Sequence, residues 1–202
     1  MKKTIFFALI VLTASSYSEV FSQNKNALGA HFELGYSADL SNTPLSITGL
    51  EFFATPTYAL GDNANIGIGL GLKVFEDSNK EKIYALPLYA RALYKLSVNK
   101  VSPFIEGKLG YTYINKDYSG KLTGYYPEYP GTVDINSTRK GGLFFSPSVG
   151  LFFPVKNRQN ISVSLAYLLD QQSIKSHAVQ INKTDKETVT HHSIAIRVGY
   201  MF

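Results

Sequence analysis

The chain contains no cysteine, and no hydrophobic run in it is long enough to form a membrane-spanning helix. Without cysteine, an exported protein has neither disulfide bonds nor the lipidated cysteine of a lipoprotein anchor. A transmembrane helix needs about 20 consecutive apolar residues, which this chain lacks. Any attachment to a membrane must therefore come from another kind of element.

Clustered positive charge is also missing. The formal net charge is +5 at pH 7, but the lysines and arginines are spread along the chain. Proteins that bind nucleic acid usually concentrate positive charge on one face or in one segment. We therefore expect no nucleic-acid partner and interpret most of these lysines as solvated loop residues.

The first residues have the organisation of a secretory signal peptide. Two lysines follow the initial methionine, residues 5–12 form an apolar core, and small residues lead to a cleavage position before Gln23. The apolar core is too short to cross a bilayer as a helix, as is typical of signal peptides. We expect residues 1–22 to be the signal peptide and residues 23–202 to form one domain.

The final residues, 194–202, alternate strictly between two kinds of side chain. The residues of one parity are apolar, namely Ile194, Ile196, Val198, Tyr200 and Phe202. Those of the other parity are small or charged, apart from Met201. A period of two indicates a β-strand that lies between two different environments.

Earlier segments show the same alternation. They comprise approximately residues 27–38, 50–60, 66–74, 84–95, 105–113, 143–153 and 161–170. The apolar parity carries no Asp, Glu, Lys or Arg in any segment, and lipid selects such a face because Arg or Lys at mid-bilayer costs about 2 to 4 kcal/mol. The pattern predicts an all-β fold, an eight-stranded antiparallel up-and-down transmembrane β-barrel with charges inside. A soluble barrel is the alternative, because several aromatic residues share the charged parity: Phe53, Tyr89, Phe104, Phe144 and Phe152.

The connections between the segments alternate in length. Short connections occupy residues 61–65, 97–101 and 156–160, and longer ones occupy residues 39–48, 76–82, 115–141 and 171–190. Short periplasmic turns and longer extracellular loops are typical of outer-membrane barrels.

Three prolines, Pro56, Pro87 and Pro147, lie inside the predicted strands. Proline cannot donate a hydrogen bond to a strand ladder, so it is usually found at strand starts, edges or bulges. We expect a β-bulge at each of the three.

Four short motifs carry a resemblance to a known family. They are Leu86–Ala90, Pro103–Tyr111, Phe145–Gly150 and Arg197–Phe202. With these motifs the chain resembles the small outer-membrane β-barrel family of Bacteroidetes-type proteins, often called porin-like. In architecture it resembles the eight-stranded outer membrane proteins A and X. The resemblance implies a barrel in the bacterial cell outer membrane, inserted by the barrel-assembly machinery through its C-terminal strand, and it implies no particular biochemical activity.

The inward charges at similar heights on neighbouring strands form pairs of opposite sign. The pairs are Glu33 with Arg197, Glu51 with Lys73, and Arg91 with Glu106. An eight-stranded barrel has room inside only for its own side chains or one small ligand, and buried charges require partners. We therefore expect a side-chain-plugged interior, with a narrow porin-like channel for ions or small solutes as the alternative.

The longest connection, residues 115–140, is rich in tyrosine and proline. Its tyrosines are Tyr118, Tyr125, Tyr126 and Tyr129. Exposed aromatic and proline-rich segments suit contact with another surface. This loop is a candidate interaction site for an extracellular ligand, and an ordinary loop without a ligand is the alternative.

A catalytic site and a metal site are both weakly supported. His191 and Ser193 faintly resemble the pair of the lipid A deacylase barrels, because a hydroxyl nucleophile needs an adjacent base. Both side chains point inward by parity, and no carboxylate is evident nearby to complete a triad. His177, His191 and His192 lack the arrangement of a metal site, because adjacent histidines on a strand point to opposite faces. We expect neither enzymatic activity nor a cofactor, and a lipid A-modifying enzyme is the less favoured alternative.

The sequence thus predicts an integral outer-membrane β-barrel with a structural or surface-interaction role. We expect it to contact outer-membrane lipid and lipopolysaccharide and to be a monomer.

Overall fold

The computed structural model describes residues 28–40, 48–76, 82–97, 101–123, 132–155, 159–179 and 183–202. Every regular element within these ranges is a β-strand. The described residues contain no helix with the length and apolar character needed to cross a membrane. The predicted signal peptide, residues 1–22, lies outside the described residues.

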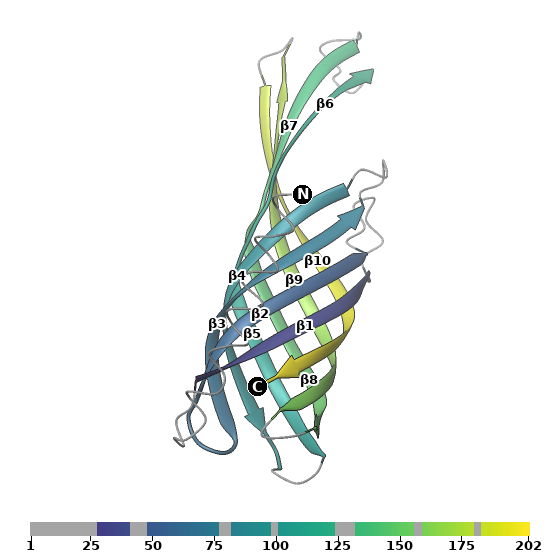
Figure 1. The fold of residues 1–202 in the computed structure, drawn as a ribbon. Helices are drawn as coiled ribbons and strands as arrows, with labels where there is room; N and C mark the ends of the chain where they lie inside the picture. The colour runs from purple at the N-terminus through teal and green to yellow at the C-terminus, as the bar shows by residue number, and fades with distance from the viewer. Residues whose placement is uncertain are drawn as a thin grey trace, which may run out of the picture.

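Eight antiparallel strands form a closed barrel, which confirms the predicted fold (Figure 1). They are β1 (Leu28–Asp39), β2 (Gly49–Ala59), β3 (Ala64–Glu76), β4 (Lys82–Lys95), β5 (Ser102–Tyr113), β8 (Leu143–Pro154), β9 (Asn160–Ala178) and β10 (Lys183–Met201). β5 pairs directly with β8, and β10 pairs with both β9 and β1. The seam ends on two backbone hydrogen bonds, Ala30 N to Phe202 O at 2.9 Å and Phe202 N to Ala30 O at 3.1 Å.

Two further strands and the outer halves of β9 and β10 form an extension beyond one end of the barrel (Figure 1). β6 (Asn115–Thr123) pairs with β7 (Thr132–Lys140), and β7 pairs with β9 beyond the end of β8. The prediction of loops over residues 115–141 and 171–190 is therefore wrong for most of their length. Most of these residues are polar at both parities, so the sequence shows no alternation of apolar and polar side chains that would have predicted strands here.

The outer face of the barrel is apolar and the inside carries the charges, which excludes a soluble barrel. Ile68 on the outer face is 70% exposed, whereas Lys108 and Arg197 inside are 0% and 1% exposed. A water-soluble barrel buries apolar side chains and exposes charges, so this inverted arrangement suits a wall in contact with lipid.

Outward-facing aromatic residues mark the two borders of the apolar wall. Near the extension they are Tyr36, Tyr84, Tyr111, Tyr113 and Tyr167, and near the short turns they are Tyr58, Tyr94, Phe153 and Tyr200. On β4 the borders lie at Tyr84 and Tyr94. At about 3.3 Å per residue and a tilt of about 40°, this span is about 25 Å tall, the height of the apolar band of membrane barrels.

The bulge prediction for the three prolines is wrong. On one side of its strand each proline keeps its register, with Pro56 opposite Ala30, Pro87 opposite Thr112 and Pro147 opposite Gly107. On the other side the ladder skips the same number of residues on both strands and resumes in the same register. The missing N–H donor therefore opens a gap in one ladder without inserting an extra residue.

Candidate functional site

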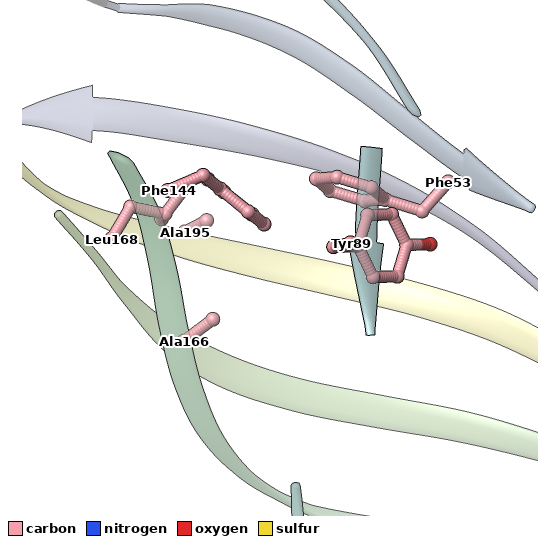
Figure 2. Packing of buried hydrophobic residues seen from close by; sticks show 6 residues of the cluster. All are labelled: Phe53, Tyr89, Phe144, Ala166, Leu168 and Ala195. Atoms are coloured by element: carbon pink, nitrogen blue, oxygen red, sulfur yellow. The ribbon is translucent and has the colours of Figure 1, made fainter. Parts of the chain in front are cut away.

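The interior of the barrel consists of apolar layers with buried charges between them. The cluster at the short-turn end contains Leu93, Phe104, Phe152 and Met201. The central cluster contains Phe53, Tyr89, Phe144, Ala166, Leu168 and Ala195 (Figure 2). The cluster at the extension end contains Phe75, Ile83, Ala85 and Ile114. Apolar residues thus cover the interior charges at both ends of the barrel.

Three aromatic rings form the centre of this interior, as Figure 2 shows. The ring centroids of Phe53 and Tyr89 are 5.5 Å apart in an edge-to-face arrangement, and Phe144 lies 6.1 Å from Phe53 and 6.0 Å from Tyr89. Inward-facing glycines of β3 make room for the rings. A Cβ at Gly69 would lie 2.5 Å from the Tyr89 ring, and a Cβ at Gly71 would lie 2.6 Å from the Phe53 ring.

Glu106 is the centre of a charge network below these rings. Its carboxylate accepts a hydrogen bond from Arg91 Nε at 2.5 Å and another from Lys108 Nζ. Lys108 Nζ also donates to Glu33 at 3.0 Å. All four side chains are buried, and the two carboxylates balance the two cations. This mutual pairing offsets the cost of removing the charges from water.

His31 extends the same network across the barrel. Its ring and the carboxylates of Glu33 and Glu106 place ligand atoms within 4.8 Å of one another, which is a metal-like spacing. Arg91 Nη2, however, lies 2.8 Å from His31 Nδ1 and donates to it, so the ring proton is on Nε2, 3.0 Å from Ser162 Oγ. Because both ring nitrogens are engaged and both carboxylates face cations, the cluster is an ion-pair network rather than a metal centre.

A second buried pair joins β10 to β2 across β1. Arg197 Nε donates to Glu51 at 2.5 Å, and Arg197 Nη2 donates to Ser146 Oγ at 3.0 Å. Gly35 on β1 is opposite both charged residues in register. A Cβ at Gly35 would lie 2.8 Å from Arg197 Cγ and 2.9 Å from Glu51 Oε1. Glycine at this position therefore lets the two side chains meet over the intervening strand.

A third pair spans the barrel nearer the extension. Lys73 on β3 forms an ion pair with Asp170 on β9, and Thr112 donates to the other oxygen of Asp170 at 2.9 Å. The Lys73 ammonium also lies 5.7 Å from the centroid of the Phe144 ring, a cation–π distance.

The structure brings together one of the three charge pairs expected from the sequence. Arg91 contacts Glu106, whereas the partners of the other predicted residues are Lys108 for Glu33, Arg197 for Glu51 and Asp170 for Lys73. Sequence reasoning compared only neighbouring strands, but long side chains reach across a narrow barrel. Lys108, Asp170 and His31 were thus missed as partners, although their parity placed all three inside.

His191 and Ser193 both point into the barrel near the extension. Each is buried, and His191 Nδ1 lies 4.0 Å from Asp39 Oδ2, so an acidic residue missed by the sequence analysis does lie beside the imidazole. Neither ring nitrogen of His191 has a hydrogen-bond partner among the described residues. Both side chains are thus enclosed by the barrel and do not face the lipid-facing wall.

The remaining predicted residues do not form a common site. His192 faces outward and its Nδ1 lies 2.5 Å from Tyr167 Oη, whereas His177 lies on the extension with its Nδ1 3.0 Å from Thr184 Oγ1. Tyr125, Tyr126 and Tyr129 lie outside the described residues, and only the backbone of Tyr118 is described. The loop-interaction prediction therefore stays a prediction.

Comparison with known proteins gives a family and a fold. The family model described as "Outer membrane protein beta-barrel domain" matches residues 4–202. Neisserial surface protein A (NspA) is 12% identical, with a TM-score of 0.54 over 86% of this chain and 95% of that chain.

Two barrels of Pseudomonas aeruginosa also match. OprG is 12% identical over 89% of this chain and 98% of that one, with a TM-score of 0.47. The N-terminal barrel domain of OprF is 11% identical over 86% and 97%, with a TM-score of 0.42. At sequence identities this low, structural similarity shows only a shared fold. For this chain that conclusion rests on the match to NspA. No curated protein matches the sequence.

Proposed function

Since the chain belongs to the outer membrane protein beta-barrel domain family and is located in the bacterial outer membrane, we propose that it is a side-chain-plugged barrel. In this proposal it has a structural or surface-interaction role and conducts neither ions nor solutes.

The observation that carries this proposal is the layered, charge-paired interior. Phe53, Tyr89 and Phe144 occupy the centre of the barrel, and all three are at most 1% exposed. Ion pairs lie on both sides of these rings, and Lys108 and Arg197 contact the Phe53 ring at 5.2 Å and 4.7 Å. A path for ions would require these pairs to separate, and breaking a buried pair costs about 3 to 5 kcal/mol.

Single-channel recording on the refolded protein in planar bilayers tests the proposal. We expect the unaltered protein to give no discrete openings. A variant that empties the aromatic layer, F53G/Y89G/F144G, is expected to give openings if it folds, and its folding is checked by heat-modifiable migration on a gel. Frequent openings of the unaltered protein that vanish in Glu51→Ala or Lys73→Ala would show that ions pass through the interior, and the plugged-barrel function would then be abandoned.

One observation favours a narrow channel as the second candidate function. Glu51 Oε2 and Arg197 Nη1 are buried and have no hydrogen-bond partner among the described residues. Buried polar atoms are normally satisfied by protein groups or water, and water at these atoms would begin a hydrated path. The same recordings distinguish this candidate, because a narrow channel would give small openings that depend on Glu51.

We assign no enzymatic activity to the chain. His191, Ser193 and Asp39 are the described residues nearest to a catalytic arrangement, and His191 and Ser193 are at most 3% exposed. Altered lipid A in cells that express the protein, abolished by Ser193→Ala, would overturn this assignment.

We propose two partners for this barrel, one that recognises its last strand and one that binds at the extension. We propose that the assembly machinery recognises β10, the strand that forms the seam with β1. At the other end, residues 115–140 are proposed to contact an extracellular ligand. Deletion of residues 118–130 should then abolish ligand binding by cells or by purified protein, and unchanged binding would exclude this loop.

A further inference from the structure

The outward face of the extension presents three exposed lysines, Lys140 on β7, Lys175 on β9 and Lys186 on β10, here called the lysine face. Lys175 and Lys186 are directly opposite each other in the β9–β10 ladder. Lys140 is opposite Ser173, two residues along β9 from Lys175. Lys175 shares its parity with Leu169 on the lipid-facing wall, so the face continues that wall above the barrel.

The positive charge of the lysine face is not neutralised by a direct ion pair in the described part of the chain. None of its three ammonium groups has an ion-pair or hydrogen-bond partner among the described residues. Asp185 and Glu187 on β10 have the opposite parity. Asp117 and Asp134 share the outward face, and Asp117 accepts a hydrogen bond from Thr138 at 2.8 Å rather than pairing with a lysine of this face. Like charges directly opposite each other destabilise a strand pair, so an anion bound here would relieve the repulsion.

An apolar groove of about 900 Å³ lies in the lipid-facing wall below the lysine face. Its floor follows one row of residues across the strands, Ile66, Ala92, Gly107, Pro147, Tyr167 and Ile194. The small side chains of Ala92 and Gly107 in the middle of this row give the groove its depth. Its upper end is at Tyr167 and Ile194, on the same two strands as Lys175 and Lys186.

We infer that this wall binds one lipopolysaccharide molecule of the outer leaflet, with acyl chains in the groove and anionic groups of the saccharide on the lysine face. The groove favours a lipid over a soluble polyanion, and the lysines favour a lipid with an anionic head. From Tyr167, at the upper end of the groove, to Lys175 the strand is about 26 Å long at about 3.3 Å per residue. At a tilt of about 40° this is about 20 Å of height, which places the lysines above the acyl chains at the level of the saccharide. The inference is independent of the proposed function, because a plugged barrel and a conducting barrel present the same outer wall.

The test uses refolded full-length protein in micelles of an uncharged detergent, titrated with purified lipopolysaccharide. The variant Lys186→Glu removes the positive charge and places a carboxylate opposite Lys175, so it should not weaken the strand pair. The substitution lowers the charge of the lysine face by two units, which is expected to weaken binding of the anionic lipid about thirtyfold. Binding by the unaltered protein should also fall with salt, because exposed charges are screened.

Lys82→Gln is the control, because Lys82 is an exposed lysine at the same end of the barrel on β4 and outside the lysine face. Glutamine avoids a second carboxylate opposite Glu76. This control variant should leave the affinity unchanged. Equal affinities of Lys186→Glu and the unaltered protein would overturn the inference.

A second variant tests whether the occupant is a lipid. Gly107→Trp fills the groove, because no atom lies within 4 Å of a Cβ at this position. It should weaken binding of lipopolysaccharide and leave any binding of the delipidated saccharide unchanged. If the delipidated saccharide binds as tightly as the intact molecule and Gly107→Trp has no effect, the lysine face binds a soluble anion and the lipid assignment is wrong.

Discussion

Single residues inside the barrel show how a narrow interior holds full charges. Glu106 receives hydrogen bonds from Arg91 and Lys108, and Gly35 allows Arg197 to reach Glu51 across a strand. Each charge is stabilised by a partner and not by water, so the loss of one partner leaves the other charge buried and uncompensated. The interior is therefore sensitive to substitutions that preserve shape but remove charge.

Glu106→Gln tests this sensitivity, because the amide has nearly the same shape and no charge. We expect it to lower the free energy of unfolding by about 3 to 5 kcal/mol, since Arg91 and Lys108 lose their shared anion. Urea unfolding of the refolded protein in lipid vesicles measures the change. The exposed Glu76→Gln is the control and should change the free energy of unfolding by less than about 1 kcal/mol.

A double variant separates lost charge pairing from lost packing. Glu106→Gln combined with Arg91→Met removes the cation that has lost its carboxylate and leaves the pair of Lys108 with Glu33 intact, so it should recover part of the lost stability. A loss for Glu106→Gln as small as that for Glu76→Gln would show that the network contributes little to stability.

At the scale of elements, the extension is added to the barrel without being needed to close it. β5 pairs with β8 along Ser102–Tyr111 and Leu143–Phe152, and this ladder does not involve β6 or β7. The hairpin pairs with β9 only beyond the end of β8. The strand pairing of the barrel is therefore complete without the β6–β7 hairpin.

Shortening the hairpin should leave the barrel intact. Lys116 and Arg139 are opposite each other in the β6–β7 ladder, so residues 117–138 can be replaced by Asn-Gly, which favours a two-residue turn. This variant should refold, and boiling should shift its migration in SDS gels as it does for the unaltered protein. Failure to show this shift, with far-UV circular dichroism that lacks strand signal, would mean that the hairpin is required for folding.

At the scale of the whole molecule, closure depends on the seam between the first and last strands. β1 and β10 pair from His31 with Met201 to Asp39 with Ser193. β10 also pairs with β9, so each residue in the middle of β10 has a partner on both sides. Closure removes every strand edge from the membrane, where an unpaired backbone group costs several kcal/mol.

Val198→Pro tests the seam without changing the interior, because Val198 faces lipid and is 52% exposed. Proline removes a ladder donor in a strand that has partners on both sides, so we expect loss of the heat-dependent gel shift and release of the protein from vesicles by urea. Val101→Pro, in the turn before β5, is the control and should behave like the unaltered protein. Normal heat-modifiable migration of Val198→Pro would contradict the importance assigned to the seam.

Sequence periodicity was sufficient for the barrel itself, because lipid and a narrow interior impose opposite demands on alternate residues of every spanning strand. Ile66 to Val74 and Ile194 to Phe202 illustrate this alternation most clearly. The same rule failed for β6 and β7, because polar residues occupy both parities there, as at Lys116 and Asp117 and at Ser137 and Thr138. Sequence reasoning also failed at Pro56, Pro87 and Pro147. A proline within a strand is compatible both with a bulge and with a ladder that lacks one hydrogen bond, and the sequence does not distinguish the two.

The alternation in the sequence therefore specifies the spanning strands, their apolar outward faces and the inward direction of their charges, since each follows from the period of a single strand. The partners of those charges depended on the tertiary structure. Lys73 meets Asp170 and Lys108 meets Glu33 across the barrel, and Glu51 meets Arg197 over Gly35, because closure and register bring together residues from strands that are not adjacent. The alignment of the lysine face above the lipid-facing groove has the same origin, because it depends on the register of β9 with β10.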